Sequence, residues 1–199
     1  MYPTPTRSWQ VLLIGGASGA GKTSVSYRLA QKFKVGITEI DDLHIAVARL
    51  TTPEQQPELH FWRLHPDPGK LSSDQALRHM IEVCRVMTPA VESVIANHLE
   101  SRVPVVLEGD FIHPALCSQQ SFCGQRNNRQ VRMLIIDEDD EEQLLSNFAQ
   151  REASLQPQRA HVSWLYGRWL KREAEASRAL VIAARPWETL FERVLRALG

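Results

Sequence analysis

The sequence predicts a three-layer α/β/α sandwich built on a five-stranded parallel sheet. Three observations predict this fold class: short runs that are apolar throughout, longer segments of helical periodicity between them, and a glycine-rich turn directly after the first apolar run. Strands that are apolar on both faces are typical of parallel sheets covered by helices on both sides. Since 199 residues suffice for one core, we expect a single domain over residues 1–199.

The first half of the chain is expected to contain two strands and several helices. In order they are a strand over 11–14, a helix over 21–33, a strand over 36–41, a helix over 45–50 and a helical stretch over 74–101. Residues 51–69 hold several prolines and are expected to be irregular. The long stretch is expected to form two helices, because Thr88-Pro89 fits an N-cap followed by a proline in the first helical position.

The second half is expected to alternate three strands with three helices. The strands lie at 103–107, 131–136 and 179–184, and the helices around 144–148, over 165–177 and over 190–198. The acidic run at 137–142 is expected to be a solvated turn whose last carboxylates complement the dipole of the next helix.

Composition excludes several classes of protein. Lys and Arg number 23, as do Asp and Glu, so the zero formal charge argues against a protein that coats nucleic acid or an anionic membrane. No apolar run approaches the roughly 20 residues that span a bilayer. The odd number of cysteines, three, does not suit a disulfide framework. These features favour a cytoplasmic protein without nucleic-acid or membrane partners.

The segment Gly16-Ala-Ser-Gly-Ala-Gly-Lys-Thr23 matches the phosphate-loop pattern G-x-x-x-x-G-K-[ST], and it lies between a predicted strand and a predicted helix. Its backbone N–H groups and the helix N-terminus can bind the phosphates of ATP, Lys22 can contact the β- and γ-phosphates, and Thr23 can ligate Mg²⁺. We expect Lys22 at the surface. The residues predicted to bind the nucleotide here are Gly16, Ala17, Ser18, Gly19, Ala20, Gly21, Lys22, Thr23 and Ser24.

Residues 15–23 resemble the opening of small P-loop kinases that phosphorylate metabolites, and Ile40-Asp-Asp-Leu-His44 resembles their second-strand signature. Residues 105–109 with 112–114, and the stretch holding Phe148, Arg151, Arg159 and Tyr166, resemble 2-phosphoglycerate kinase-like proteins. The resemblance implies the P-loop NTPase fold, ATP and Mg²⁺ as cofactors, and a helical lid around 148–172. The expected strand order is 2-3-1-4-5.

Carboxylates that follow the second and third strands are candidates for the chemistry. Ligands of open α/β sheets bind at the carboxyl edge, so Asp41 is the predicted general base, with Asp42 as the alternative. Glu39 would share the strand face of Asp41 and help hold Mg²⁺, as would Glu108. Another interpretation of the Asp pair is a helix cap. The predicted acceptor-binding residues are Asp42, His44, Asp110, His113 and Arg159.

Arginines are expected to stabilise the charge that develops on the transferred phosphoryl group. Arg151 is the predicted catalytic arginine, and Arg159 lies in the same expected lid. Arg185 follows the last strand and could stack on adenine, beside Trp187.

The sequence thus favours an ATP-dependent phosphotransferase that acts on a hydroxyl of a small metabolite, 2-phosphoglycerate-like or other. An antibiotic, nucleoside or polynucleotide kinase would use the same layout. A nucleotide-binding switch that transfers nothing is the alternative from another class. A cavity beside the γ-phosphate position, between Asp41 and Lys22, would distinguish a kinase from a switch.

Overall fold

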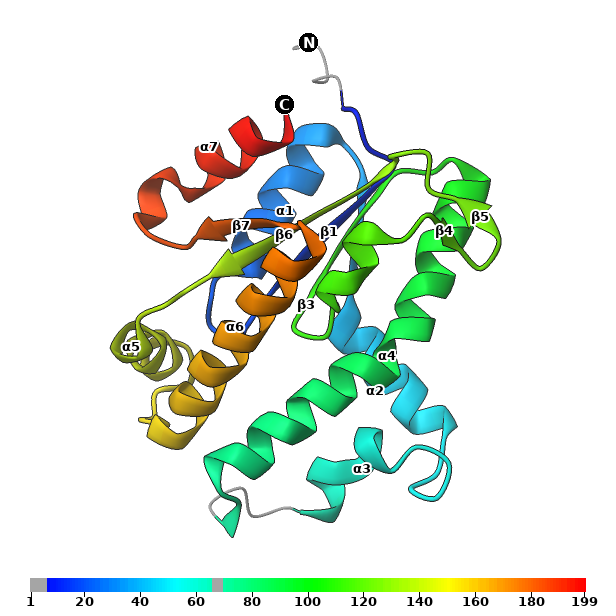
Figure 1. Ribbon diagram of the computed structural model, residues 1–199. Coiled ribbons are helices and arrows are strands. Elements are labelled where there is room, and N and C mark those ends of the chain that lie inside the picture. The colour runs from blue at the N-terminus through cyan, green and yellow to red at the C-terminus, as the bar shows by residue number, and fades with distance from the viewer. Residues whose placement is uncertain (1–6, 66–69) are drawn as a thin grey trace.

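The computed structural model describes residues 7–65 and 70–199. Its main sheet consists of β1 (Val11–Gly16), β2 (Gly36–Glu39), β3 (Val105–Gly109), β6 (Val131–Asp137) and β7 (Leu180–Ala183). All neighbouring strands of this sheet are parallel, in the order β2-β3-β1-β6-β7 (Figure 1). Counting only these five strands, this is the expected order 2-3-1-4-5, and the predicted fold class is confirmed.

The connections are mostly helical. The helices are α1 (Lys22–Phe33), α2 (Ile40–Leu50), α3 (Pro57–Leu64), α4 (Ser73–Ser101), α5 (Glu141–Glu152), α6 (Pro157–Ser177) and α7 (Trp187–Leu198). A 3₁₀ helix, η2 (Pro114–Ser118), precedes a small hairpin of β4 (Ser121–Phe122) and β5 (Gln125–Arg126). Within the described ranges, no helix is long and apolar enough to cross a bilayer.

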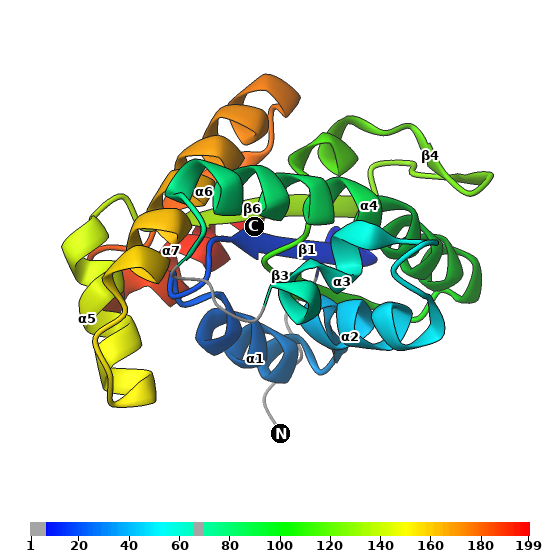
Figure 2. The same cartoon turned by 90° about the horizontal axis from the view of Figure 1, so that it is seen from below.

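The two faces of the sheet pack against different helices because successive strand residues point to opposite sides. On β1, Leu12 and Ile14 pack with α1 and α7 in one core cluster, whereas Val11 and Leu13 pack with α4 and α6 in the other. Figure 2 shows α4 and α6 on one side of the sheet and α1 on the other. The result is the expected three-layer arrangement.

Helix α4 is one continuous helix, and the predicted break at Thr88-Pro89 is wrong. Thr88 Oγ1 donates to the carbonyl oxygen of Cys84 at 3.0 Å instead of capping a new helix. The apolar stripe also continues through the proline, since Met87 and Val91 are both fully buried. Burial of that stripe outweighs the hydrogen bond that Pro89 cannot make.

Two further differences concern the segment after β2. The predicted strand 36–41 ends at Glu39, and α2 starts directly at Ile40 rather than near residue 45. Helix α3 forms inside the stretch 51–69, with Pro57 at its first position, where proline is tolerated. Sequence reasoning gave its prolines too much weight as helix breakers.

The carboxyl ends of β1, β2 and β3 lie at one edge of the sheet. The register pairs Glu39 with Glu108 and Gly15 with Gly109, so the residues that follow these strands are brought together. This edge carries the candidate site.

Candidate functional site

The phosphate loop connects β1 to α1. Gly19 and Gly21 have φ angles of 84° and 89°, in the left-handed region that favours glycine. A Cβ at Gly21 would lie 2.2 Å from the Trp187 ring, so a larger residue would displace that ring. The loop therefore has the backbone conformation of an anion-binding nest at a helix N-terminus.

Lys22 is buried, only 6% exposed, and the expectation that it lies at the surface is wrong. Its Nζ forms an ion pair with Asp110 Oδ1 at 2.5 Å and donates to the carbonyl oxygen of Ala17 at 3.0 Å. Burial disfavours the ammonium, but Asp110, followed by Glu108 and Asp41, outweighs burial and raises the pKa of Lys22. The lysine therefore remains charged, and its hydrogen bond to Ala17 fixes its ammonium group against the phosphate loop.

Thr23 and Glu108 form a pair that fits a Mg²⁺ ion. Thr23 Oγ1 donates to Glu108 Oε1 at 3.1 Å, while the buried Glu108 Oε2 has no hydrogen-bond partner among the described residues. Burial raises the pKa of Glu108, with Lys22 and Thr23 opposing the shift. Magnesium is typically bound by one or two protein oxygens, with waters and substrate phosphates completing the octahedron. The donors present fit such an ion.

Glu39, the other predicted metal residue, accepts a hydrogen bond from Tyr27 Oη at 2.5 Å. Because the chain becomes helical at Ile40, the expected strand alternation between Glu39 and Asp41 does not apply. Tyr27 holds Glu39 at the same edge as Glu108, its register partner, where it adds negative charge.

Asp41 lies in the first turn of α2 and faces the same edge. The N-cap position belongs to Glu39, so Asp41 is not the helix cap. Although Asp41 keeps contact with solvent, the protein around it restricts its hydration and raises its pKa to about 6. The Asp110 carboxylate adds to this shift, and Lys22 opposes it. A carboxylate with a raised pKa beside a lysine suits a general base.

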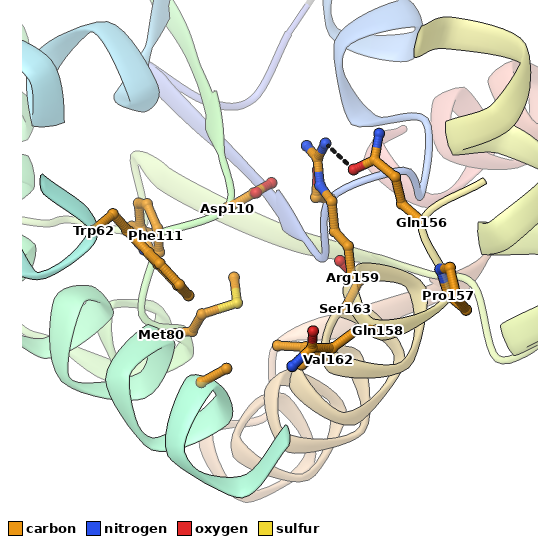
Figure 3. A pocket seen from close by; sticks show the side chains of 12 residues that line it. Trp62, Met80, Asp110, Phe111, Gln156, Pro157, Gln158, Arg159, Val162 and Ser163 are labelled. Atoms are coloured by element: carbon orange, nitrogen blue, oxygen red, sulfur yellow. Dashed lines mark hydrogen bonds between the residues drawn. The ribbon is translucent and has the colours of Figure 1, made fainter. Parts of the chain in front are cut away.

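A cavity of about 590 Å³ opens at Asp110, the ion-pair partner of Lys22, and neither Lys22 nor Asp41 is among its lining residues. Ser18 of the phosphate loop, Asp110 and Arg159 contribute polar groups to its wall. The lining residues are Ser18, Trp62, Ala76, Met80, Asp110, Phe111, Gln156, Pro157, Gln158, Arg159, Val162 and Ser163. Figure 3 shows Asp110 and Phe111 across the cavity from Arg159.

The structure brings two predicted acceptor residues, Asp110 and Arg159, to this cavity, whereas Asp42, His44 and His113 are not among its lining residues. The His44 ring packs edge-on against Phe111 with centroids 5.3 Å apart. His113 Nδ1 accepts from the backbone N–H of Ala115 and caps η2. Burial lowers the pKa of both histidines.

Sequence reasoning missed Trp62, Met80 and Phe111, because apolar side chains carry no motif.

A second cavity, of about 380 Å³, lies on the other side of the phosphate loop. It is lined by Gly19, Gly21, Gln143, Asn147, Gln150, Arg185 and Trp187. Arg185 Nε donates to the buried carboxylate of Glu138 at 2.8 Å, so Glu138 is not part of a solvated turn as expected. Asn147 Nδ2 donates to the Gly19 carbonyl oxygen at 3.0 Å. This cavity adjoins the phosphate loop, and its Trp187 ring offers a flat surface of the kind on which a nucleotide base stacks.

The two predicted arginines of the lid lie close together. Glu152 Oε1 accepts from both Arg151 and Arg159 at 2.7 Å, and both guanidinium groups lie over the Phe148 ring. The hydrogen bond from Gln156, followed by those from Arg151 and Arg159, lowers the pKa of Glu152 to about 2. Arg159 lines the cavity, whereas Arg151 is not among its lining residues.

No family model matches the sequence. The 2-phosphoglycerate kinase of Methanothermobacter thermautotrophicus is 22% identical over 204 residues, which cover 94% of this chain and 65% of that protein. The same enzyme of Methanococcus vannielii is 24% identical over 119 residues, 55% of this chain and 38% of that protein. The chain therefore spans less than two thirds of the length of these relatives.

Solved kinase structures share the fold. A gluconokinase from Sinorhizobium meliloti 1021 aligns with a TM-score of 0.53 at 18% identity, covering 97% of this chain and 93% of that one. A deoxyadenosine kinase from M. mycoides with bound dATP aligns with a TM-score of 0.51 at 9% identity, covering 95% and 98%.

The fold and the phosphate loop define a P-loop protein that shares its fold with solved kinases. Within this class, its sequence resembles that of 2-phosphoglycerate kinase.

Proposed function

We propose that the protein is a kinase that transfers the γ-phosphate of ATP to a hydroxyl group of a small metabolite, with Mg²⁺ as cofactor. The observation that carries this proposal is the cavity of about 590 Å³ that shares Ser18 and Asp110 with the phosphate-loop region. A nucleotide-binding switch has no use for a deep pocket at that place. An acceptor bound there lies next to the γ-phosphate position, as direct transfer requires.

Each charged residue has a role in this reaction. Asp41 accepts the proton of the acceptor hydroxyl, whose oxygen attacks the γ-phosphorus while ADP leaves. Lys22 and the loop amides hold the phosphates. When the nucleotide binds, Lys22 gives up its ion pair with Asp110 and contacts phosphate oxygens instead. Thr23 and Glu108 would hold Mg²⁺, which supplies charge stabilisation for the transferred group. The carboxylates of Asp41, Glu108 and Asp110 act on Lys22, and Glu39 lies near Asp41 and Glu108. Together they leave an excess of negative charge that suits this cation.

The cavity wall favours an acceptor with an apolar body over a strongly acidic one. Among its twelve lining residues only Asp110 and Arg159 are charged, and Arg159 is already bound to Glu152 and Gln156. A phosphorylated acid such as 2-phosphoglycerate needs several cations. Trp62, Met80 and Phe111 instead offer apolar surface, which supports an antibiotic or another alcohol with an apolar body as the acceptor rather than an acidic metabolite.

An acceptor screen tests this function. We expect ADP release to depend on an added alcohol, with apolar alcohols ahead of gluconate and 2-phosphoglycerate. Replacing Trp62 by alanine should raise the acceptor KM about tenfold or more, because an aromatic wall contributes about 1.5–3 kcal/mol. Trp164→Ala, which alters an aromatic residue outside the lining, is the control. Turnover with 2-phosphoglycerate alone would reject the apolar acceptor but keep the kinase, and no acceptor-dependent turnover would reject the kinase.

We propose a lid narrower than 148–172, since Tyr166 and Leu170 are fully buried in the main core and cannot swing out.

The lid arginines are expected to differ in their effect on turnover. Arg159→Ala should lower kcat about tenfold or more with little change in nucleotide affinity, as expected for a transition-state contact. Arg151→Ala should do the same only if closure moves Arg151 to the γ-phosphate. Steady-state kinetics with separate nucleotide titrations measure both, and an unchanged kcat in both variants would remove the arginines from the mechanism.

A further inference from the structure

A large cleft lies at the opposite edge of the sheet from the phosphate loop. It has a volume of about 1140 Å³ and is built by η2, the β4–β5 hairpin and its following loop, and the starts of β6 and β7. The amino end of β6 borders this cleft, whereas its carboxyl end lies at the catalytic edge, next to Gly16 of β1. Seven strand residues at about 3.3 Å each separate the two places by roughly 20 Å.

Four arginines line the cleft: Arg126, Arg129, Arg132 and Arg178. All four are exposed, and no acidic residue is among the lining residues. The chain has equal numbers of acidic and basic residues, so this excess of positive charge is local. None of the four guanidinium groups has an ion pair or hydrogen bond to a described residue, in contrast to Arg151, Arg159 and Arg185 at the catalytic edge.

The rest of the wall combines polar side chains and open backbone with a few apolar residues, among them Val131, Met133 and Leu180. Ser118, Gln119 and Asn128 contribute hydroxyl and amide groups. Strand β7 pairs with β6 only from Leu134 onward, so the outer edge of the first residues of β6 has no strand partner in the described part of the chain. A ligand in this cleft therefore meets guanidinium, amide and hydroxyl groups together.

We propose that this cleft is a binding site for a small polyanion that carries at least two phosphate or carboxylate groups. Unpaired guanidinium groups bind such groups through two parallel hydrogen bonds, and four of them match several negative charges on one molecule. No aromatic side chain lines the cleft, so it lacks the stacking surface that single-stranded nucleic acid uses. The site is separate from the phosphate loop and can be filled while a nucleotide is bound.

Calorimetric titration with inorganic tripolyphosphate tests the proposal, with the phosphate loop first saturated by a non-hydrolysable ATP analogue and Mg²⁺. One molecule of tripolyphosphate should bind, and more weakly as salt rises. The triple variant Arg129→Gln, Arg132→Gln, Arg178→Gln should bind it more than about tenfold more weakly, since it loses the charged hydrogen bonds of three guanidinium groups. Its affinity for the ATP analogue should be unchanged.

The matched control is the triple variant Arg49→Gln, Arg172→Gln, Arg196→Gln, which removes the same charge from exposed positions outside the cleft. It should bind tripolyphosphate as the unmodified protein does. Absence of saturable binding, or equal loss in the two triple variants, would overturn the site. Tighter binding of a short single-stranded oligonucleotide through the same arginines would overturn the assignment to a small polyanion.

Discussion

Replacing Lys22 by methionine is expected to abolish turnover and to weaken binding of Mg²⁺–ATP by about 10–100-fold or more. The variant loses the charged hydrogen bonds to the phosphates, each of which contributes about 1.5–3 kcal/mol. Calorimetric titration with an ATP analogue measures the change. Lys32→Met, an exposed lysine on the same helix, is the control. Unchanged nucleotide affinity in the Lys22 variant would contradict phosphate binding at this loop.

The same variant should also lose stability in a pH-dependent manner, because Lys22 is buried between carboxylates. Without the ammonium, nothing from Lys22 opposes the burial that raises the pKa values of Glu108 and Asp41, so both pKa values rise further. The loss of stability is then largest at pH 8, where these groups are ionised, and shrinks as the pH falls and they bind protons. Urea unfolding of the variant and the unmodified protein at pH 5.5 and pH 8 measures this difference. A loss that does not depend on pH would show that the carboxylates do not depend on Lys22.

Asp41→Asn is expected to lower kcat by about 10²–10⁴-fold, the usual contribution of a general base, with little change in nucleotide affinity. Because the pKa of Asp41 is raised to about 6, kcat/KM of the unmodified enzyme should fall as the pH drops below about 6 and the carboxylate is protonated. The variant should lack this acid limb. Measuring ADP release against pH, with the acceptor found in the screen, tests both statements.

The neighbouring Asp42→Asn is the matched control, since it removes the same charge one residue further along α2, whereas Asp41 is the residue that interacts with Lys22 and Asp110. It should keep nearly full activity. If both substitutions had the same effect, the charge of the helix start rather than a general base would explain it. If Asp42→Asn alone removed activity, the base would be Asp42.

Local patterns predicted much of the architecture. The phosphate loop was found because its function needs particular residues at fixed spacing along a continuous segment, so Gly21, Lys22 and Thr23 identify it without any tertiary contact. The strands were predicted for a similar reason, since apolar runs between helices indicate a parallel sheet, whereas their order was expected from the resemblance to P-loop kinases. The predictions that failed were those in which local signals compete with packing, such as the helix break at Pro89.

The contents of the site depend on contacts that no local pattern reports. Lys22 and Asp110 are 88 residues apart in sequence, yet their ion pair decides the burial and pKa of the lysine. The cavity wall combines Trp62 of α3, Met80 of α4 and Val162 of α6, whose apolar side chains are indistinguishable from core residues in the sequence.

The sequence by itself therefore determined the nucleotide-binding loop, the sheet and the carboxylates at its edge, because these follow from neighbours along the chain. Only the tertiary structure decided which carboxylate meets Lys22, that His44 and His113 stay outside the cavity, and that four arginines gather at the far edge. The physical reason is that a cavity and its charges arise where segments far apart in the sequence pack together. Their burial, hydration and ion pairs are set by that packing rather than by residue type.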